Sequence, residues 1–165
     1  MDDLKSLLVS GRGSALLGMR CVVAGASSGI GRATAIHLAR EGASLLLHAR
    51  KNRAGLDETL DLVRTAGAGQ GSYETVLADL AESDRCLDLV ETAWRWGGPI
   101  DAWIHLAGAD VLTGEARGWS FERKLQTLWQ TDVVGTLTTT REVGRRMSAD
   151  RRGRRAQVVA ADDAN

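Results

Sequence analysis

The sequence has no excess of either charge, few cysteines and no long apolar run. Lysine plus arginine number 21 and aspartate plus glutamate number 21, so no overall field draws the chain to nucleic acid or to an anionic membrane. No segment approaches the roughly 20 consecutive apolar residues that a membrane-spanning helix needs. Partners must therefore be sought in local sites.

The opening segment and the cysteines bear on the cellular compartment. The stretch MDDLKSLLVSGRGS carries acids where a secretory signal carries bases, and its apolar piece at residues 7–9 is too short for one. Cys21 falls in an expected strand and Cys86 in an expected helix, and neither has a partner at metal-ligand spacing. We therefore expect a cytoplasmic protein whose cysteines are reduced packing thiols.

Short apolar runs alternate with longer amphipathic stretches, as in βαβ units. The expected strands are 21–24, 44–48, 73–77, 103–106 and 157–161; the expected helices are 29–41, 53–66, 84–96 and a long one from 121 to about 148. Glycines expected to take the left-handed conformation near helix ends are Gly42, Gly67, Gly97 and Gly153.

This order of elements predicts the fold. Crossovers between neighbouring parallel strands are almost always right-handed, so we expect an α/β fold of Rossmann-like type, a doubly wound parallel sheet in a three-layer αβα arrangement. Residues 19–165 are expected to form a single domain, and residues 1–18 an N-terminal arm or short helix. Ligands then belong at the carboxyl ends of the strands.

The stretch AGASSGIG, residues 24–31, joins an apolar strand to a helix. A loop at this place turns the free amides of the next helix outward, and those amides and the helix dipole favour an anion. Gly25 is expected to make the tight turn, Gly29 to let a phosphate approach the backbone, and Gly31 to let the helix pack closely. The alternative is a plain glycine-rich turn, but the strand before and the helix after favour dinucleotide binding.

The spacing of Gly25, Gly29, Ile30 and Gly31 resembles the TGxxxGxG loop of the short-chain dehydrogenases/reductases, with Ala24 in the threonine position. ADL at residues 78–80, LAG at residues 106–108 and TDVVGT in the long helix follow in the order of that family. The resemblance implies an NAD(P) site, with Asp79 holding the adenine and Leu80 flanking it; Asp79 could instead be only a turn residue or helix cap. The residues expected to bind the cofactor are Gly25, Ser27, Ser28, Gly29, Ile30, Gly31, Arg50, Asp79, Leu80, Ala107 and Gly108.

The segment after the second strand, LLLHARKNRAG, contains no acid. An acid there usually binds the ribose hydroxyls of NAD, whereas an arginine accommodates the 2′-phosphate of NADP. Arg50 and Lys51 stand at that place and Arg53 follows, so we expect NADP rather than NAD. The alternative is a solvated basic loop.

The catalytic pattern that the resemblance implies is incomplete. The family uses a tyrosine as general acid/base and a lysine four residues later, but the one tyrosine here, Tyr73, has Leu77 at that distance. Asp162 or Asp163 occupies the place of the catalytic serine, and Asp132 the place of an asparagine that serves a water relay. Asp132 and Asp163 are the candidate catalytic residues; the alternatives are a structural acid at Asp132 and a turn at Asp163. The resemblance also implies that the sheet is incomplete on its C-terminal side.

Two functions from different classes follow. The first is an NADP-dependent oxidoreductase acting on a small carbonyl or alcohol substrate, whose tyrosine and lysine lie outside this chain. The second is a non-catalytic NADP-binding module or redox sensor. Nucleic-acid binding through the RRGRR segment at residues 151–155 is disfavoured, because positive charge there also suits the carboxyl end of the long helix. From the resemblance alone, we expect a homodimer or homotetramer.

Overall fold

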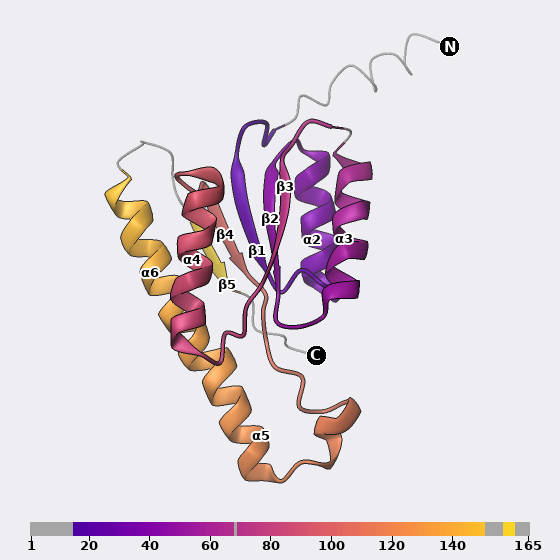
Figure 1. Ribbon diagram of the computed structural model, residues 1–165, viewed down its shortest axis with the longest axis vertical. Coiled ribbons are helices and arrows are strands. Elements are labelled where there is room, and N and C mark those ends of the chain that lie inside the picture. The colour runs from indigo at the N-terminus through magenta and orange to yellow at the C-terminus, as the bar shows by residue number, and fades with distance from the viewer. Residues whose placement is uncertain (1–14, 68, 151–156, 161–165) are drawn as a thin grey trace.

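The computed structural model describes residues 15–67, 69–150 and, as backbone, 157–160. Within these ranges the chain forms a five-stranded, entirely parallel sheet in the order β3-β2-β1-β4-β5 (Figure 1). The strands are β1 (Arg20–Ala24), β2 (Ser44–Ala49), β3 (Tyr73–Leu77), β4 (Ala102–His105) and β5 (Gln157–Ala160).

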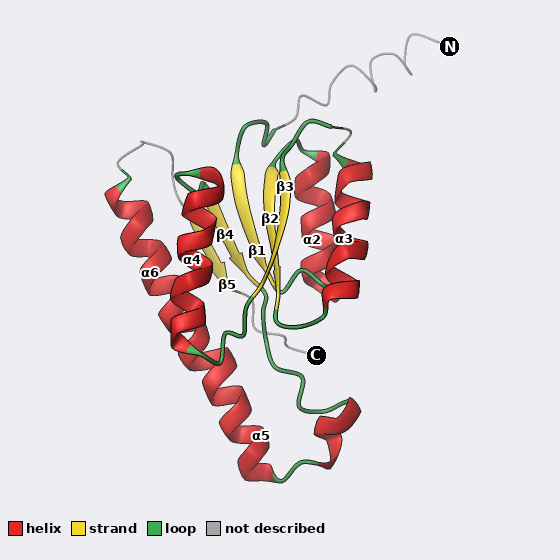
Figure 2. Ribbon diagram, viewed as in Figure 1, coloured by secondary structure: helices red, strands yellow, loops and turns green. Residues whose placement is uncertain are grey.

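Helices cover both faces of the sheet (Figure 2). α2 (Gly29–Arg40) and α3 (Arg53–Ala66) lie on one face, and α4 (Ser83–Gly97) and α6 (Thr136–Ala149) lie on the other. The predicted Rossmann-like, three-layer α/β fold is therefore confirmed, and these strands and the first three helices agree with their predicted bounds within one residue.

The core has two halves because the central strands are buried on both faces. Alternate residues of β1 and β2, among them Val23 and Leu45, pack under α2 and α3, while Val22 and Leu46 face α4 and α6. Near-continuous apolar strands such as these are typical of parallel sheets covered on both sides. The thiols of Cys21 and Cys86 are free and buried, one in each half of the core.

The long helix differs from the prediction. It consists of α5 (Phe121–Leu128), a π-helical segment η2 (Trp129–Gly135) and α6, rather than one continuous α-helix. Its later part is buried at Gly135, Thr139 and Val143, whereas α5 has no buried residue and the side chains of Phe121 and Leu125 are exposed. Only the later part of the long helix therefore packs into the hydrophobic core.

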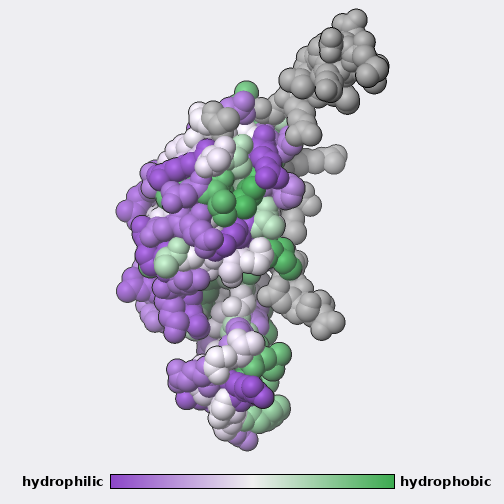
Figure 3. Space-filling model, turned by 90° about the vertical axis from the view of Figure 1, so that its right-hand side faces the viewer, coloured by the Kyte–Doolittle hydropathy of each residue, from purple (hydrophilic) through white to green (hydrophobic). Residues whose placement is uncertain are grey.

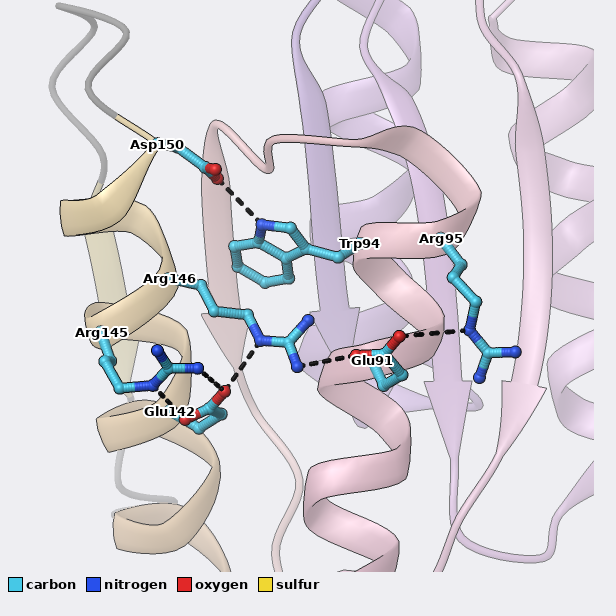
Figure 4. Close-up of polar contacts among 7 residues, drawn as sticks. All are labelled: Glu91, Trp94, Arg95, Glu142, Arg145, Arg146 and Asp150. Atoms are coloured by element: carbon cyan, nitrogen blue, oxygen red, sulfur yellow. Dashed lines mark hydrogen bonds and ion pairs between the residues drawn. The ribbon is translucent and has the colours of Figure 1, made fainter.

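A polar network fixes α6 to α4 (Figure 4). The Arg146 guanidinium donates to Glu142 on its own helix at 2.8 Å and to Glu91 on α4 at 2.7 Å. It also lies over the Trp94 ring, whose Nε1 donates to Asp150 at 2.9 Å. This network holds the end of the long helix against α4.

Glycine conformations at the helix ends correct part of the prediction. Gly42 has a φ of +87°, as expected, but after α4 the left-handed residue is Gly98, with φ +72°, rather than Gly97. Gly67 has a right-handed φ of −82°, since a following glycine, Gly69, takes the positive φ instead. Gly153 lies outside the described residues.

The lower lobe of the molecule, which α5 and the segment before it form, has hydrophobic residues on one side and hydrophilic residues on the other (Figure 3). Leu112, Phe121, Leu125 and Trp129 are among the exposed large apolar residues of the chain. No helix in the described part of the chain is both long enough and apolar enough to cross a membrane.

Candidate nucleotide-binding site

A cavity of about 1090 Å³ opens at the carboxyl ends of the strands. It lies beside β1, which pairs with β2 on one side and β4 on the other, and this is where the strand order reverses and open parallel sheets bind ligands. All the residues predicted to bind a cofactor line it except Asp79: Gly25, Ser27, Ser28, Gly29, Ile30, Gly31, Arg50, Leu80, Ala107 and Gly108.

The glycine loop is built on close backbone contacts. Gly25 has a φ of +87°, and a Cβ there would overlap the carbonyl of Leu106 on the neighbouring loop. A Cβ on Gly31 would overlap the Gly25 carbonyl, so this glycine lets α2 approach its own loop. Gly29 has a φ of +52° and nothing within 4 Å of where a Cβ would lie. This open position beside the cavity is the kind that lets a ligand reach the backbone.

The amides of the loop differ in their availability. Those of Gly25 and Ala26 donate to the His48 carbonyl at 3.0 and 2.8 Å. Within the described residues, the amides of 27–31 have no protein acceptor, and no side chain caps the start of α2 at Ser28. The amides free for an anion therefore begin at Ser27.

The segment after β2 brings positive charge to the cavity. Arg50, Lys51 and Asn52 line it. Within the described residues, neither Arg50 nor Lys51 makes an ion pair, whereas Arg53 is bonded to Asp57 on α3 at 3.0 Å and does not line the cavity. Arg50 and Lys51 are therefore available to a ligand, and Arg53 is engaged elsewhere.

Asp79 and Leu80 follow β3 but have different surroundings. Leu80 lines the cavity, whereas Oδ1 of Asp79 accepts a hydrogen bond from the Ala81 amide at 3.0 Å. This local bond is the turn role that the sequence left open for Asp79. Its role in holding an adenine stays a prediction.

Asp132 lies in η2 and contacts the loop after β4. Its Oδ1 accepts a hydrogen bond from the Ala109 amide at 2.8 Å, so the carboxylate is tied to that loop. Asp132 also lines the cavity, together with Thr131 from the same turn and Thr136 at the start of α6. The π-helical turn thus brings two polar residues to the cavity, and such turns are frequent at functional sites.

Two histidines flank β1 at the cavity edge. His48 on β2 and His105 on β4 are both in register with Ala24, and both are buried. Burial lowers the pKa of both rings; that of His105 falls from 6.5 to about 4, helped by repulsion from His48. Nε2 of His105 lies 3.2 Å from the Thr136 hydroxyl. Both rings are therefore neutral near pH 7.

Two aromatic residues, Trp119 and Tyr73, do not line the cavity. Asp162 and Asp163 lie outside the described residues. Trp119 stacks against Arg123, 3.9 Å from its ring centre, and does not line the cavity. Tyr73 lies at the amino end of β3, opposite the cavity edge, and burial raises the pKa of its phenol.

Several lining residues were not predicted: His48, Thr131 and Thr136. The register of β2 against β1 places His48 there, the π-helical turn places Thr131, and the start of α6 places Thr136. Neither feature has a sequence signal as clear as the glycine spacing.

Comparison with known proteins gives the family. The sequence model of the family described as short chain dehydrogenase matches residues 20–161. Gluconate 5-dehydrogenase of Gluconobacter oxydans is 33% identical over 147 residues, which cover 88% of this chain and 54% of that protein. The chain belongs to the short-chain dehydrogenase family.

Solved structures agree with the observed fold. A short-chain dehydrogenase/reductase from Serratia marcescens superposes with a TM-score of 0.69 at 26% identity, covering 81% of this chain and 52% of that one. An NADH-dependent reductase crystallised with NAD gives a TM-score of 0.74 at 27% identity, covering 89% and 60%. The chain thus spans roughly half the length of the relatives it matches.

Proposed function

We propose that the cavity binds NADP and that the chain is the nucleotide-binding part of an oxidoreductase. The substrate would be a small carbonyl compound or alcohol. When bound, the nicotinamide would donate or accept a hydride. The observation that carries the proposal is the row of amides at residues 27–31, which have no protein acceptor within the described part of the chain and belong to residues that line a cavity at the carboxyl edge of the sheet.

The residues present fit a dinucleotide. Gly29 leaves open space for a phosphate at the start of α2, and Leu80, Ala107 and Gly108 supply an apolar or side-chain-free wall further along the cavity. Arg50 would bind the 2′-phosphate through two parallel hydrogen bonds, with Lys51 beside it. The choice of NADP over NAD rests on Arg50 and Lys51, neither of which forms an ion pair with another described residue. Membership of the family does not make this choice, because one related structure holds NAD.

The chain's own residues would position rather than protonate a substrate. Asp132 fixes the loop after β4 through the Ala109 amide. Tyr73 is the one tyrosine of the sequence and lies away from the cavity, so it is not the general acid/base. The tyrosine and lysine of the family pattern are absent from this sequence, and we expect no turnover by this chain. A non-catalytic NADP-binding module is the alternative.

We also propose that the chain self-associates, and the exposed apolar residues of α5 support this proposal.

The test is separate titration with NADPH and NADH, followed by Arg50→Ala and Arg53→Ala. We expect NADPH to bind more tightly, and Arg50→Ala to weaken NADPH by about tenfold or more while leaving NADH within about twofold. Arg53→Ala is the matched control, because this arginine has the same charge but is bonded to Asp57. Equal affinities of the wild type for the two nucleotides would remove the NADP assignment, and no binding of either would remove the function.

A further inference from the structure

A partly buried polar cluster lies behind the glycine loop and does not line the cavity. Arg32 follows Gly31 on α2 but does not line the cavity. Its Nη2 donates to the Ser27 carbonyl at 2.8 Å and to Glu58 on α3 at 2.8 Å, and its Nε donates to the Thr59 hydroxyl at 3.0 Å. The cluster therefore joins the loop to a helix more than twenty residues further along the chain.

Thr59 contacts both Arg32 and the backbone of the glycine loop. Its side chain is fully buried, and its hydroxyl lies 2.9 Å from the carbonyls of both Ala26 and Gly55. Since the hydroxyl accepts from Arg32, its own proton is available to either carbonyl. A Cβ on Gly55 would lie 2.6 Å from the Ser27 carbonyl, so the start of α3 touches the loop backbone directly.

Peptide geometry links these carbonyls to the cavity. The peptide bonds are trans, so each carbonyl points opposite to the amide of the next residue. A side chain that holds the Ser27 carbonyl therefore directs the Ser28 amide the other way, and one that holds the Ala26 carbonyl directs the Ser27 amide. Both serines line the cavity, and both amides are without a protein acceptor among the described residues.

We propose that Arg32 and Thr59 are positioning residues that aim the amides of Ser27 and Ser28 at the pyrophosphate of the nucleotide. This inference rests on the proposed function. The charge of Arg32 is balanced by Glu58 at 2.8 Å, so its effect is exerted through the direction of its hydrogen bonds. Arg32 touches the loop from behind and makes no contact with the nucleotide.

The experiment compares two probes on the intact chain: NADPH, and adenosine 2′-monophosphate, which has the adenine, ribose and 2′-phosphate but no pyrophosphate. The variants are Arg32→Lys, which keeps the charge but loses the forked geometry, and Thr59→Val, which keeps the shape but loses the hydroxyl. Thr59→Ser restores the hydroxyl. Arg64→Lys, in an exposed pair with Asp61, is the matched control on α3. Binding is measured well below the midpoint of thermal unfolding of every variant.

We expect Arg32→Lys and Thr59→Val each to weaken NADPH by about tenfold while leaving adenosine 2′-monophosphate within about twofold. Thr59→Ser should restore NADPH binding, and Arg64→Lys should change neither probe. If Arg32→Lys does not fold, the Thr59→Val and Thr59→Ser pair decides.

Unchanged NADPH affinity in folded Arg32→Lys and Thr59→Val would overturn the inference, and so would an equal loss of both probes, which would indicate a merely structural role. Failure of the wild type to bind NADPH would instead overturn the proposed function.

Discussion

Replacing Gly135 by alanine tests the contact between the π-helical turn and the loop that carries Leu80. Gly135 is buried in η2, and a Cβ there would overlap the Leu80 carbonyl oxygen, with the Leu80 carbonyl carbon at 3.1 Å and the Gln130 carbonyl oxygen at 3.3 Å. All three atoms belong to the backbone, so no side chain can rotate away. The helix or the loop must move instead.

Gly144, on α6 of the same long helix, is the matched control. A Cβ there meets nothing within 4 Å, so Gly144→Ala should gain roughly 0.5–1 kcal/mol of stability from the better helix propensity of alanine. Gly135→Ala has the same intrinsic gain, but overpacking against fixed backbone costs roughly 1–3 kcal/mol. The net change expected for Gly135→Ala is therefore a loss of about 1–2 kcal/mol.

The stability changes of Gly135→Ala and Gly144→Ala are measured by thermal unfolding, with circular dichroism as the signal. For a chain of this size 1 kcal/mol shifts Tm by about 2–4 °C, so Gly135→Ala should lower Tm by roughly 2–8 °C and Gly144→Ala should raise it by roughly 1–4 °C. Because Leu80 lines the cavity, Gly135→Ala should also weaken NADPH binding. Equal or higher stability of Gly135→Ala relative to Gly144→Ala would refute the close contact.

Two further predictions concern stability. His105 has a pKa of about 4 in the folded chain and 6.5 ordinarily, so the unfolded chain binds more protons between these values and stability falls as pH drops from about 6.5 to 4. The loss is about 3 kcal/mol, measured as the pH dependence of urea unfolding, and His105→Asn should flatten it; an unchanged slope would contradict the shift. Arg146→Ala should remove the link between α4 and α6 and lower the stability by about 1 kcal/mol without changing NADPH affinity. Calorimetry measures the loss of stability of Arg146→Ala, and titration measures its NADPH affinity. Altered nucleotide binding would contradict the assignment of this network to stability alone.

Most of the fold could be predicted from the sequence because the signals are local. Apolar runs bounded by glycines gave strand and helix limits to within one residue, as in β3 at Tyr73–Leu77. The long helix could not be predicted in detail, since a π-helical turn depends on contacts such as that of Gly135 with Leu80. Periodicity assumes constant spacing and cannot detect such a change.

The candidate site was predictable where one short loop makes it and unpredictable where distant segments meet. The glycine spacing of residues 25–31 located the cavity. The bonds from the Gly25 and Ala26 amides to the His48 carbonyl depend on strand register, and the contact of Arg32 with Thr59 joins two helices. Sequence reasoning had no means of pairing these residues.

The π-helical turn also divides the long helix into two segments with separate constraints. Residues after it, such as Val143, are enclosed against the sheet, while residues before it, such as Phe121, face outward. Substitutions in the first segment can therefore alter the outer surface of the protein without disturbing the hydrophobic interior.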